Sequence, residues 1–348
     1  NALANPNFET GTLSGWTNSS VSGGSAAVVA TGGHVNSGTY GCDVVGVDAT
    51  HPGWIQQTIE VSAGEYRQVG AFIKITSGGS VSAFFIIYNN TTRKYWNGST
   101  WGSTFAGTSI PTASLNGATF TFVSANYRVE DFDTCRADTV ILSIGILNQA
   151  GTIAVDDVQD VPGVSFAAVI GHNLNGVTSV VQYDASGAFS GGEANLSSMT
   201  IARAAYFSTF VMTFTSPWRL VFGGTNWDEP YIGELVLGQY QTCATSPKWG
   251  FSTERNLPAV RGRGPSSRPY TYNLATEPTR DLDMSFTPRT EAQATEIENM
   301  VLRSGQGRYP TIIVPIDTEA GVYYGRLDEP TSRTRPFHGV HEIPLRLV

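Results

Sequence analysis

The sequence predicts a mainly β protein, with tandem β-sandwich domains followed by a C-terminal β-sandwich that carries one flanking α-helix. Only 14 % of the residues are charged, whereas Gly, Ser, Thr and Asn are abundant and runs of Val, Ile and Phe recur, a composition typical of strands joined by turns. Segments of alternating polarity are short and show no sustained helical period before the last part of the chain. The 348 residues exceed one ordinary hydrophobic core, so two or three domains are expected.

The first predicted domain, residues 1–161, consists of short strands separated by Gly, Asn and Ser turns. In the segment 54–61 the even positions face one side and the mostly apolar odd positions face the other, which predicts one wet face and one face in the core. The strands expected in this domain are 54–61, 68–76, 81–89, 119–123, 139–146 and 152–158.

The segment RKYWNGSTW, residues 93–101, predicts a β-hairpin because the Asn-Gly pair at 97–98 favours a two-residue turn. This register would place Trp96 opposite Ser99, and it would put both tryptophans on one face. Such a face could stack on a sugar ring; alternatively, the tryptophans cover the core or a subunit contact. The candidate carbohydrate-binding residues are Lys94, Tyr95, Trp96 and Trp101.

The Pro-Gly pair in DVPGVS, residues 160–165, predicts a linker. A second set of strands follows and forms the second predicted domain, residues 162–243. Its expected strands are 166–170, 179–183, 205–214, 218–222 and 231–237.

The third predicted domain, residues 244–348, combines strands with one helix at 290–304. Thr290 and Gln293 form a capping-box pattern at the helix start, and Gly305 marks its end. The stretch RGRGPSSR, 261–268, predicts an exposed basic loop. The apolar residues at helical spacing are Ile297, Met300 and Val301, and the expected strands are 281–286, 311–316, 322–327 and 343–348.

Charge and hydropathy exclude two classes of partner. The formal net charge of −8 argues against nucleic-acid binding, because the phosphate backbone would repel the chain. No apolar run reaches the about 20 residues of a spanning helix, so we expect no membrane insertion. Cys42, Cys135 and Cys243 fit no CxxC spacing, so they form one disulfide at most or stay as buried thiols.

We expect the protein not to be an enzyme. The sequence contains no nucleophile elbow, no HExxH, no phosphate-binding loop and no Rossmann fingerprint. Glycoside hydrolysis needs two carboxylates across a cleft, and the neighbouring acidic pairs of this chain are explained more simply as turn residues. The pair His338 and His341 has a spacing that specifies no metal.

Asp156 and Asp157 interrupt the apolar strand IAVDDV. A buried charge costs several kcal/mol unless it is paired or ligates a cation. Glu9, in the opening stretch NPNFETGTLSGW, could complete a set of carboxylate ligands of the kind that Ca²⁺ takes. Alternatively, one aspartate caps a turn and the other points to water.

These two motifs resemble those of jelly-roll carbohydrate-binding modules, which open with NPxFExGxLxGW and close with a strand of the xxVDDVxx type. The matching residues are 5–16 and 153–158, so the resemblance covers about the first 160 residues. It implies a jelly roll with a structural Ca²⁺ ligated by Glu9 and by Asp156 or Asp157. It implies sugar binding less directly, since many relatives keep the fold without the aromatic cleft.

The second half of the chain resembles virion proteins of tailed bacteriophages. The stretches AAVIGHNLNG, WRLVFGG and YIGELVLGQY are similar to a galactose-binding-like β-sandwich of tail and baseplate proteins. The strand, helix and closing strands after residue 280 are similar to sandwich-plus-helix domains of tail tubes and distal tail rings. The resemblance therefore implies an assembly or docking role for residues 244–348.

Together, the resemblances imply a virion structural protein of a phage tail tip or baseplate that also attaches to host-surface glycans. Its partners would be other tail or baseplate proteins and copies of itself. The alternative is a secreted carbohydrate-binding protein or a lectin-like module of a larger glycosidase. That alternative explains the first domain equally well, but it gives the helix-bearing C-terminal domain no role.

Overall fold

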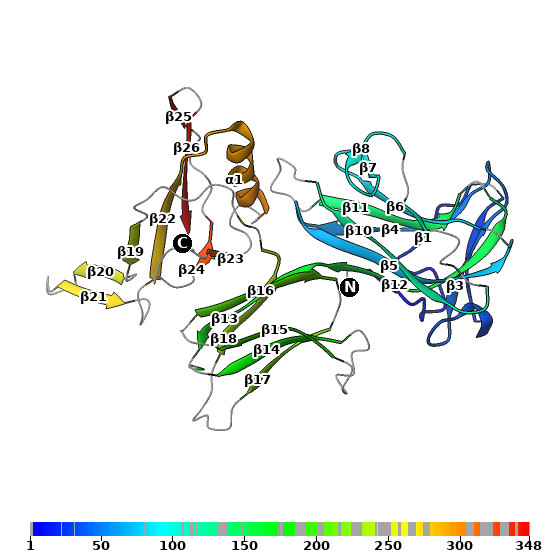
Figure 1. The fold of residues 1–348 in the computed structure, drawn as a ribbon, viewed down its shortest axis with the longest axis horizontal. Helices are drawn as coiled ribbons and strands as arrows, with labels where there is room; N and C mark the ends of the chain where they lie inside the picture. The colour runs from blue at the N-terminus through cyan, green and yellow to red at the C-terminus, as the bar shows by residue number, and fades with distance from the viewer. Residues whose placement is uncertain are drawn as a thin grey trace.

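In the computed structural model, the described residues form several antiparallel β-sheets and one α-helix (Figure 1). The structure describes residues 3–21, 23–30, 32–79, 81–105, 108–110, 115, 117–130, 138–147, 149–172, 174, 177–184, 193–200, 205–214, 217–223, 232–240, 242, 252–256, 259–263, 269–273, 279–303, 310–313, 323–327, 334–337 and 340–347. The mainly β fold class predicted from composition and periodicity is confirmed.

Two sheets form the first module, at the right of Figure 1. Sheet I has the order β1-β4-β11-β6-β7-β8, with β9 also paired to β6; its strands are β1 (Thr17–Asn18), β4 (Gly53–Val61), β11 (Asp138–Ile146), β6 (Ala83–Asn89), β7 (Lys94–Trp96), β8 (Trp101–Gly102) and β9 (Thr108–Ile110). Sheet II has the order β10-β5-β12-β3-β2; its strands are β10 (Thr121–Arg128), β5 (Tyr66–Ser77), β12 (Gly151–Pro162), β3 (Gly41–Gly46) and β2 (Ser25–Val29). A short 3₁₀ turn, η1 (Gly32–His34), precedes β3.

Strand β4 shows how the sequence pattern builds the core. Its odd-numbered residues are buried and its even-numbered residues are not, as the alternation predicted. Gln57 is the polar member of the buried set, at 6 % exposed. Its amide donates to the carbonyls of Ala4 and Gly15 and accepts from the Ala4 amide, which satisfies the groups that burial removes from water.

The opening motif plugs one end of this core. Phe8 is fully buried and Trp16 is 6 % exposed, with ring centroids 5.8 Å apart. The indole of Trp16 donates to the Asn5 carbonyl, and the amide of Val158 in β12 donates to the Pro6 carbonyl. The start of the module therefore lies against the strand that ends it.

The hairpin at β7 and β8 has a different register from the predicted one. Trp96 pairs with Trp101 rather than with Ser99, because residues 97–100 form a four-residue loop. The side-chain oxygen of Asn97 accepts from the amides of Ser99 and Thr100 at 3.0 and 2.8 Å, and this side-chain turn replaces the two-residue turn. Both tryptophans still share one face, opposite to the side of Tyr95.

The second module consists of two three-stranded sheets. One is β16 (Ala205–Thr213), β13 (Val164–His172) and β18 (Ile232–Gly238); the other is β15 (Ala194–Thr200), β14 (Thr178–Tyr183) and β17 (Trp218–Gly223). Only Gly163 separates β12 from β13, so the chain passes from the first module to the second through a shorter break than the linker predicted at 160–165. Pro162 still pairs with Arg67 across sheet II.

The remaining described strands lie at the left of Figure 1, with the helix of the described residues beside them. The strands are β19 (Ser252–Asn256), β22 (Thr279–Phe286), β26 (Val340–Leu347) and β25 (Thr334–Phe337) in one sheet, with the pairs β20 (Ala259–Arg263) and β21 (Pro269–Asn273), and β23 (Pro310–Ile313) and β24 (Tyr323–Arg326). An exposed loop was predicted at 261–268, but its first three residues, 261–263, belong to strand β20. Its partner holds Tyr270 and Tyr272, which favour strands.

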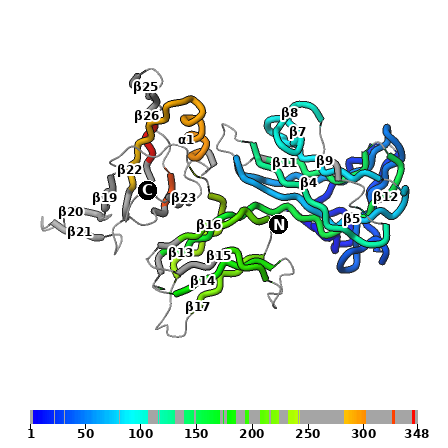
Figure 2. Tube along the Cα trace, in the orientation of Figure 1, coloured from blue at the N-terminus to red at the C-terminus, as the bar shows by residue number. Residues whose placement is uncertain are grey.

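Helix α1 (Glu291–Arg303) begins where the capping pattern predicted. The Gln293 amide donates to Thr290 Oγ1 at 3.2 Å, while the Gln293 side chain accepts from the Arg289 amide. Ile297 and Val301 are each 1 % exposed and pack on the apolar residues of the sheet. Figure 2 shows the Cα trace of the molecule in the same view. Four residues named in the sequence predictions lie outside the described residues: Gly305, Cys135, Cys243 and His338.

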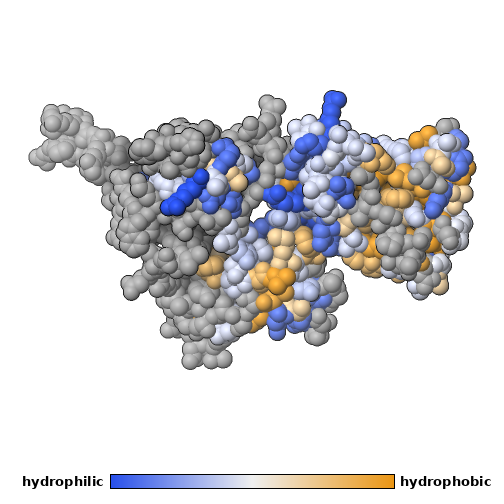
Figure 3. Space-filling model, turned by 45° about the horizontal axis from the view of Figure 1, so that its top comes forward, coloured by the Kyte–Doolittle hydropathy of each residue, from blue (hydrophilic) through white to orange (hydrophobic). Residues whose placement is uncertain are grey.

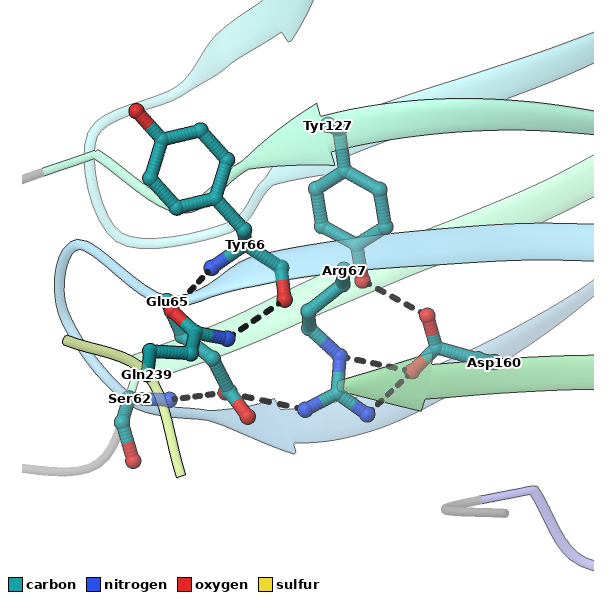
Figure 4. Close-up of polar contacts among 7 residues, drawn as sticks. All are labelled: Ser62, Glu65, Tyr66, Arg67, Tyr127, Asp160 and Gln239. Carbon is teal, nitrogen blue, oxygen red and sulfur yellow. Dashed lines mark hydrogen bonds and ion pairs between the residues drawn. The ribbon is translucent and has the colours of Figure 1, made fainter. Parts of the chain in front are cut away.

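The junction between the first two modules contains a buried charged network (Figure 4). Arg67 on β5 is 5 % exposed and donates to Asp160 Oδ2 through Nε at 2.9 Å and Nη2 at 2.6 Å. Tyr127 on β10 donates to the other Asp160 oxygen at 2.9 Å, and Glu65 lies 2.9 Å from Arg67 Nη1. Beside this network, Gln239 of the second module bonds to the backbone of Tyr66.

Candidate functional site

The outward face of sheet I carries a group of aromatic rings. Residues paired across β4, β11, β6 and β7 lie on the same side of the sheet. The pairing defines three outward rows, which are Trp54, Gly145 and Phe84; Gln56, Ser143 and Ile86; and Thr58, Ile141, Tyr88 and Tyr95. We call these three rows, with Phe105, the aromatic face.

The middle row lies deepest in the aromatic face. Ile86 and Ser143 are only 5 % and 6 % exposed although they point away from the core. Phe85 and Ile87, the residues on either side of Ile86 in β6, point the other way and belong to the core. Ile86 and Ser143 are therefore largely shielded from water on the outward side of the sheet.

The first row has glycine at position 145, where no side chain fits. A Cβ there would overlap the Gly53 carbonyl and Trp54 Cβ. Trp54 and Phe84 therefore flank a position that has no side chain. The tight pairing at this point thus leaves no room for a side chain at position 145.

The third row continues into a chain of ring contacts. Tyr88 and Tyr95 have ring centroids 4.7 Å apart, and Tyr95 and Phe105 are 5.2 Å apart. Phe105, which follows β8, is 53 % exposed. Figure 3 shows hydrophobic residues at the surface over this module; its exposed large hydrophobic residues are Val21, Val47, Tyr66, Phe105 and Phe122.

The chemistry of the aromatic face is stacking combined with neutral hydrogen bonding. Aromatic rings offer large apolar areas, and Gln56 and Ser143 offer an amide and a hydroxyl that both donate and accept. The three rows contain no Lys, Arg, Asp or Glu. Such a surface suits a neutral ligand that is apolar on one side and rich in hydroxyl groups at its edges.

The structure divides the predicted sugar-binding residues between two sides of the hairpin. Tyr95 lies on the aromatic face. Trp96 is 8 % exposed, and Trp101 packs against the same core; their indoles donate to the carbonyls of Asn126 and Arg128 at 3.1 and 2.7 Å. The two indoles therefore tie the edge of sheet I to β10 of sheet II.

Lys94 belongs with the two tryptophans rather than with Tyr95. Its ammonium group forms an ion pair with Glu130, just beyond the end of β10. This contact continues the line of attachment that the indoles make to the same strand. The structure thus places three of the four predicted residues where they hold the two sheets together.

The three predicted calcium ligands contact one loop, residues 36–40. Glu9 accepts from the amides of Thr39 and Tyr40 at 2.8 and 2.9 Å. Asp156 accepts from the amides of residues 36 and 37 at 2.8 and 3.0 Å, and Asp157 accepts from the side chains of the same two residues. The loop is therefore held from both ends by carboxylates.

A bulge in β12 explains how adjacent aspartates reach the same loop. The register shifts between Asp156 and Gln159, and Asp157 has a φ of 45°. Asp156 is fully buried, and burial raises its pKa, opposed by the amides of the loop. Because a buried carboxylate needs such donors, the loop and the bulge support each other.

The donor set has the oxygen chemistry of a calcium site, but protein groups are bonded to it. Glu9 Oε1, Asp156 Oδ2 and both Asp157 carboxylate oxygens accept hydrogen bonds from the loop. Within the described part of the chain, no group of three or more His, Cys, Asp or Glu side chains is arranged to hold a metal. The calcium site stays a prediction.

Sequence reasoning missed most of the aromatic face. Trp54, Phe84, Tyr88 and Phe105 were not among the candidate residues, although the alternation in 54–61 already placed Trp54 on the wet face. The signal that was needed is the cross-strand register of β4, β11 and β6. That register depends on residues far apart in the chain: Phe84 and Gly145 are 61 residues apart, and Trp54 and Gly145 are 91 residues apart.

No protein-family model and no curated protein matches the chain. Solved structures with a similar fold include the enzymatically active domain of tailspike protein 4 of bacteriophage CBA120, at 18 % identity and a TM-score of 0.35, over 47 % of this chain and 21 % of that one. This chain therefore spans about a fifth of the tailspike domain.

Two carbohydrate-binding modules are similar as well. TmCBM61, solved with β-1,4-galactotriose, is 20 % identical, with a TM-score of 0.32, over 47 % of this chain and 98 % of that one. The CBM22-1 and GH10 modules of Clostridium thermocellum xylanase 10B, solved with xylohexaose, are 20 % identical, with a TM-score of 0.32, over 45 % of this chain and 28 % of that one.

The described residues include no helix of the length and apolarity that crossing a bilayer requires.

Proposed function

We propose that the protein binds a neutral glycan on the aromatic face of its first module. The observation that carries this proposal is the row arrangement, in which two ring-bearing rows flank a deeper row with an amide and a hydroxyl. Sugar rings present an apolar face that stacks on aromatic side chains and equatorial hydroxyl groups that bond to polar ones. The motifs of residues 5–16 and 153–158, which resemble carbohydrate-binding modules, support the same function.

Binding would use the residues of the three rows in distinct ways. The rings of Trp54 and Tyr95 would stack on sugar rings from the two ends of the face. Gln56 would bond to hydroxyl groups between them, because its amide supplies a donor and an acceptor. The glycan chain would therefore run across the strands rather than along one of them.

The test compares Trp54→Ala and Tyr95→Ser with the wild type by affinity electrophoresis through gels that contain neutral polysaccharides, xylan and β-1,4-galactan. We expect each substitution to weaken retention about tenfold, the loss of a well-placed aromatic anchor. Tyr240→Ser is the matched control, because Tyr240 is 49 % exposed in the second module. If the wild type is retained and both variants are retained equally well, the aromatic face is not the glycan-binding site.

We propose further that this binding serves attachment of a virion, with residues 244–348 docking the protein into a phage tail tip or baseplate. The support is the sequence resemblance of residues 167–240 and of the segment after residue 280 to tail and baseplate proteins. Antibodies against the purified chain should label virion tails, and negative-stain microscopy should show rings or larger assemblies. A chain that stays monomeric and labels no virion would instead favour the secreted carbohydrate-binding protein.

We propose that the protein acts by binding rather than by catalysis, since the sequence holds no recognisable catalytic constellation. Incubation with each polysaccharide that it retains should release no new reducing ends. The calcium prediction has its own test. Chelation with EDTA should lower the melting temperature of the first module, whereas an unchanged melting curve would remove Glu9, Asp156 and Asp157 as ligands.

A further inference from the structure

Sheet II carries a second aromatic strip on its outward side, opposite to the aromatic face. The pairing of β5 with β10 defines it. From one end to the other, its rows are Lys74 with Phe120, Phe72 with Phe122, Gly70 with Ser124, Gln68 with Asn126, and Tyr66 with Arg128. We call this the second face.

The ring of Phe122 lies against β5 in the second face. A Cβ added to Gly70 would come within 2.5 Å of its ring, so the ring rests directly over this glycine. The ring centroid is 5.2 Å from that of Phe72, and Phe122 is 39 % exposed. A partly exposed aromatic ring offers an apolar surface on which a cyclic ligand stacks.

Each end of the second face carries a cation over a ring. Lys74 Nζ lies 6.0 Å from the centroid of Phe120, and the Arg128 guanidinium lies 5.6 Å from that of Tyr66. Tyr66 is 43 % exposed, and Figure 4 shows its ring turned away from the buried network. Each end therefore has a cationic group beside an aromatic ring, and Lys74 Nζ also donates to the Gly33 carbonyl at 2.9 Å.

The centre of the second face is polar and uncharged. Gln68 donates to Asn126 at 2.8 Å, and Ser124 is exposed beside them. The nearest acidic side chain in the paired rows is Asp156, opposite Phe72 on β12, and it is buried beneath the loop 36–40. The second face thus carries one cationic side chain at each end, Lys74 and Arg128, on a chain whose net charge is −8.

The dimensions favour a linear ligand over a protein. Lys74 and Tyr66 are eight residues apart on β5, which is about 26 Å at about 3.3 Å per residue. Two strands are about 10 Å wide, so the strip covers roughly 260 Å². A stable protein interface needs about 800 Å² on each partner, about three times the area available.

We propose that the second face binds an acidic polysaccharide, whose sugar rings stack on Phe122 and whose carboxylates pair with Lys74 and Arg128. Amides and hydroxyls at the centre suit the hydroxyl groups of such a chain. Charged hydrogen bonds from Arg and Lys to carboxylates are stronger than neutral ones. The molecule would then hold two glycan sites of different charge on opposite sheets.

The experiment measures retention of the full chain in gels that contain polygalacturonate, with Phe122→Ser and Arg128→Gln as the test variants. We expect each to weaken retention about tenfold, and added salt to weaken the wild type further. Tyr95→Ser is the matched control, because it removes a ring from the other sheet and should leave this retention unchanged. Melting curves check that the variants stay folded.

Any of three outcomes would overturn the proposal that the second face binds an acidic polysaccharide. The first is that polygalacturonate does not retain the wild type, and the second is that both test variants are retained like the wild type. The third is that Tyr95→Ser abolishes retention of neutral and acidic polysaccharides together. Loss of self-association in Phe122→Ser, seen by sedimentation velocity without loss of retention, would assign the surface to a second copy of the chain. If xylan and galactan gels showed no binding through the aromatic face, the proposed neutral-glycan function would fail. The polygalacturonate result would still test the second face by itself.

Discussion

At the residue scale, the most consequential group is the charged network at the end of the first module. Asp160 is fully buried and accepts three hydrogen bonds, from Arg67 and Tyr127. Burial alone would oppose the charge on Arg67, but the facing carboxylates raise its pKa. Such a network gives little net stability over an apolar one, yet the loss of one partner leaves a charge in the interior.

We therefore expect Asp160→Ala to lower the free energy of unfolding by about 3 to 5 kcal/mol, toward the lower end because Glu65 still faces Arg67. Urea denaturation followed by tryptophan fluorescence measures this change. The double variant Arg67→Met with Asp160→Leu is the control, since it removes both charges and should recover most of the loss. A double variant as unstable as Asp160→Ala would show that packing, not charge, holds the site.

Cys42 provides a second residue-scale prediction, on pH. Its thiol is fully buried, and burial raises its pKa from 9.0 to about 12. The folded state therefore keeps a proton that the unfolded chain releases above about pH 9, so stability falls as the pH rises from about 9 toward 12. Urea midpoints at pH 8 and pH 10.5 should differ less for Cys42→Ala than for the wild type, and an equal difference would contradict the prediction.

At the element scale, composition and alternation were sufficient to predict most strands. The segment 139–146 became β11 and the segment 54–61 became β4, each within one residue, because period-two alternation records one buried face. Local chemistry predicted α1 equally well through Thr290 and Gln293. Strand ends in sheet II were underestimated, since β12 continues to Pro162 by pairing with β5, a partner that sequence alone does not supply.

The candidate site was harder to predict than the strands. The hairpin register is set by the side chain of Asn97, which closes a four-residue loop. The position of the tryptophans is set by backbone acceptors in β10, a strand of the other sheet. Neither depends on local propensity. The alternative that the tryptophans cover the core was already open at the sequence level, and their burial agrees with it.

We expect Trp96→Ala to behave as a core substitution. Trp96 is 8 % exposed and its indole bonds to the Asn126 carbonyl, so truncation should cost about 3 to 5 kcal/mol. Thermal denaturation measures the loss. Tyr95→Ser on the opposite side of β7 should change the melting temperature much less, and an equally small effect of Trp96→Ala would place its indole outside the core.

At the scale of the whole molecule, the first two modules are joined by more than a peptide chain. The Tyr66 amide donates to Gln239 Oε1 at 3.0 Å, and the Tyr66 carbonyl accepts from Gln239 Nε2 and from the Gly163 amide, both at 2.8 Å. The Tyr240 amide adds a bond to Ser165 Oγ at 3.0 Å. A side-chain amide that pairs with both backbone groups of Tyr66 imitates one step of a β-ladder.

This pairing lies beside the buried network, and the same Tyr66 carbonyl also bonds to Gly163, so it should fix the direction in which the second module leaves the first. We expect Gln239→Ala to free the Tyr66 amide and speed its hydrogen exchange about tenfold, because local opening no longer breaks two bonds. Exchange mass spectrometry of the peptide that contains residue 66 measures this. Small-angle scattering should show a broader distribution of module arrangements.

The control is Gln182→Ala, which removes a glutamine that bonds to Asn195 and Arg219 within the second module. It should leave both the exchange of Tyr66 and the scattering curve unchanged. Equal effects of the two substitutions would mean that general loosening of the second module, rather than the pairing with Tyr66, moves the junction. An unchanged Tyr66 amide in Gln239→Ala would show that the short β12 to β13 connection alone holds the two modules. In that case the direction of the two glycan faces would be set by the backbone at Gly163 and not by a side chain.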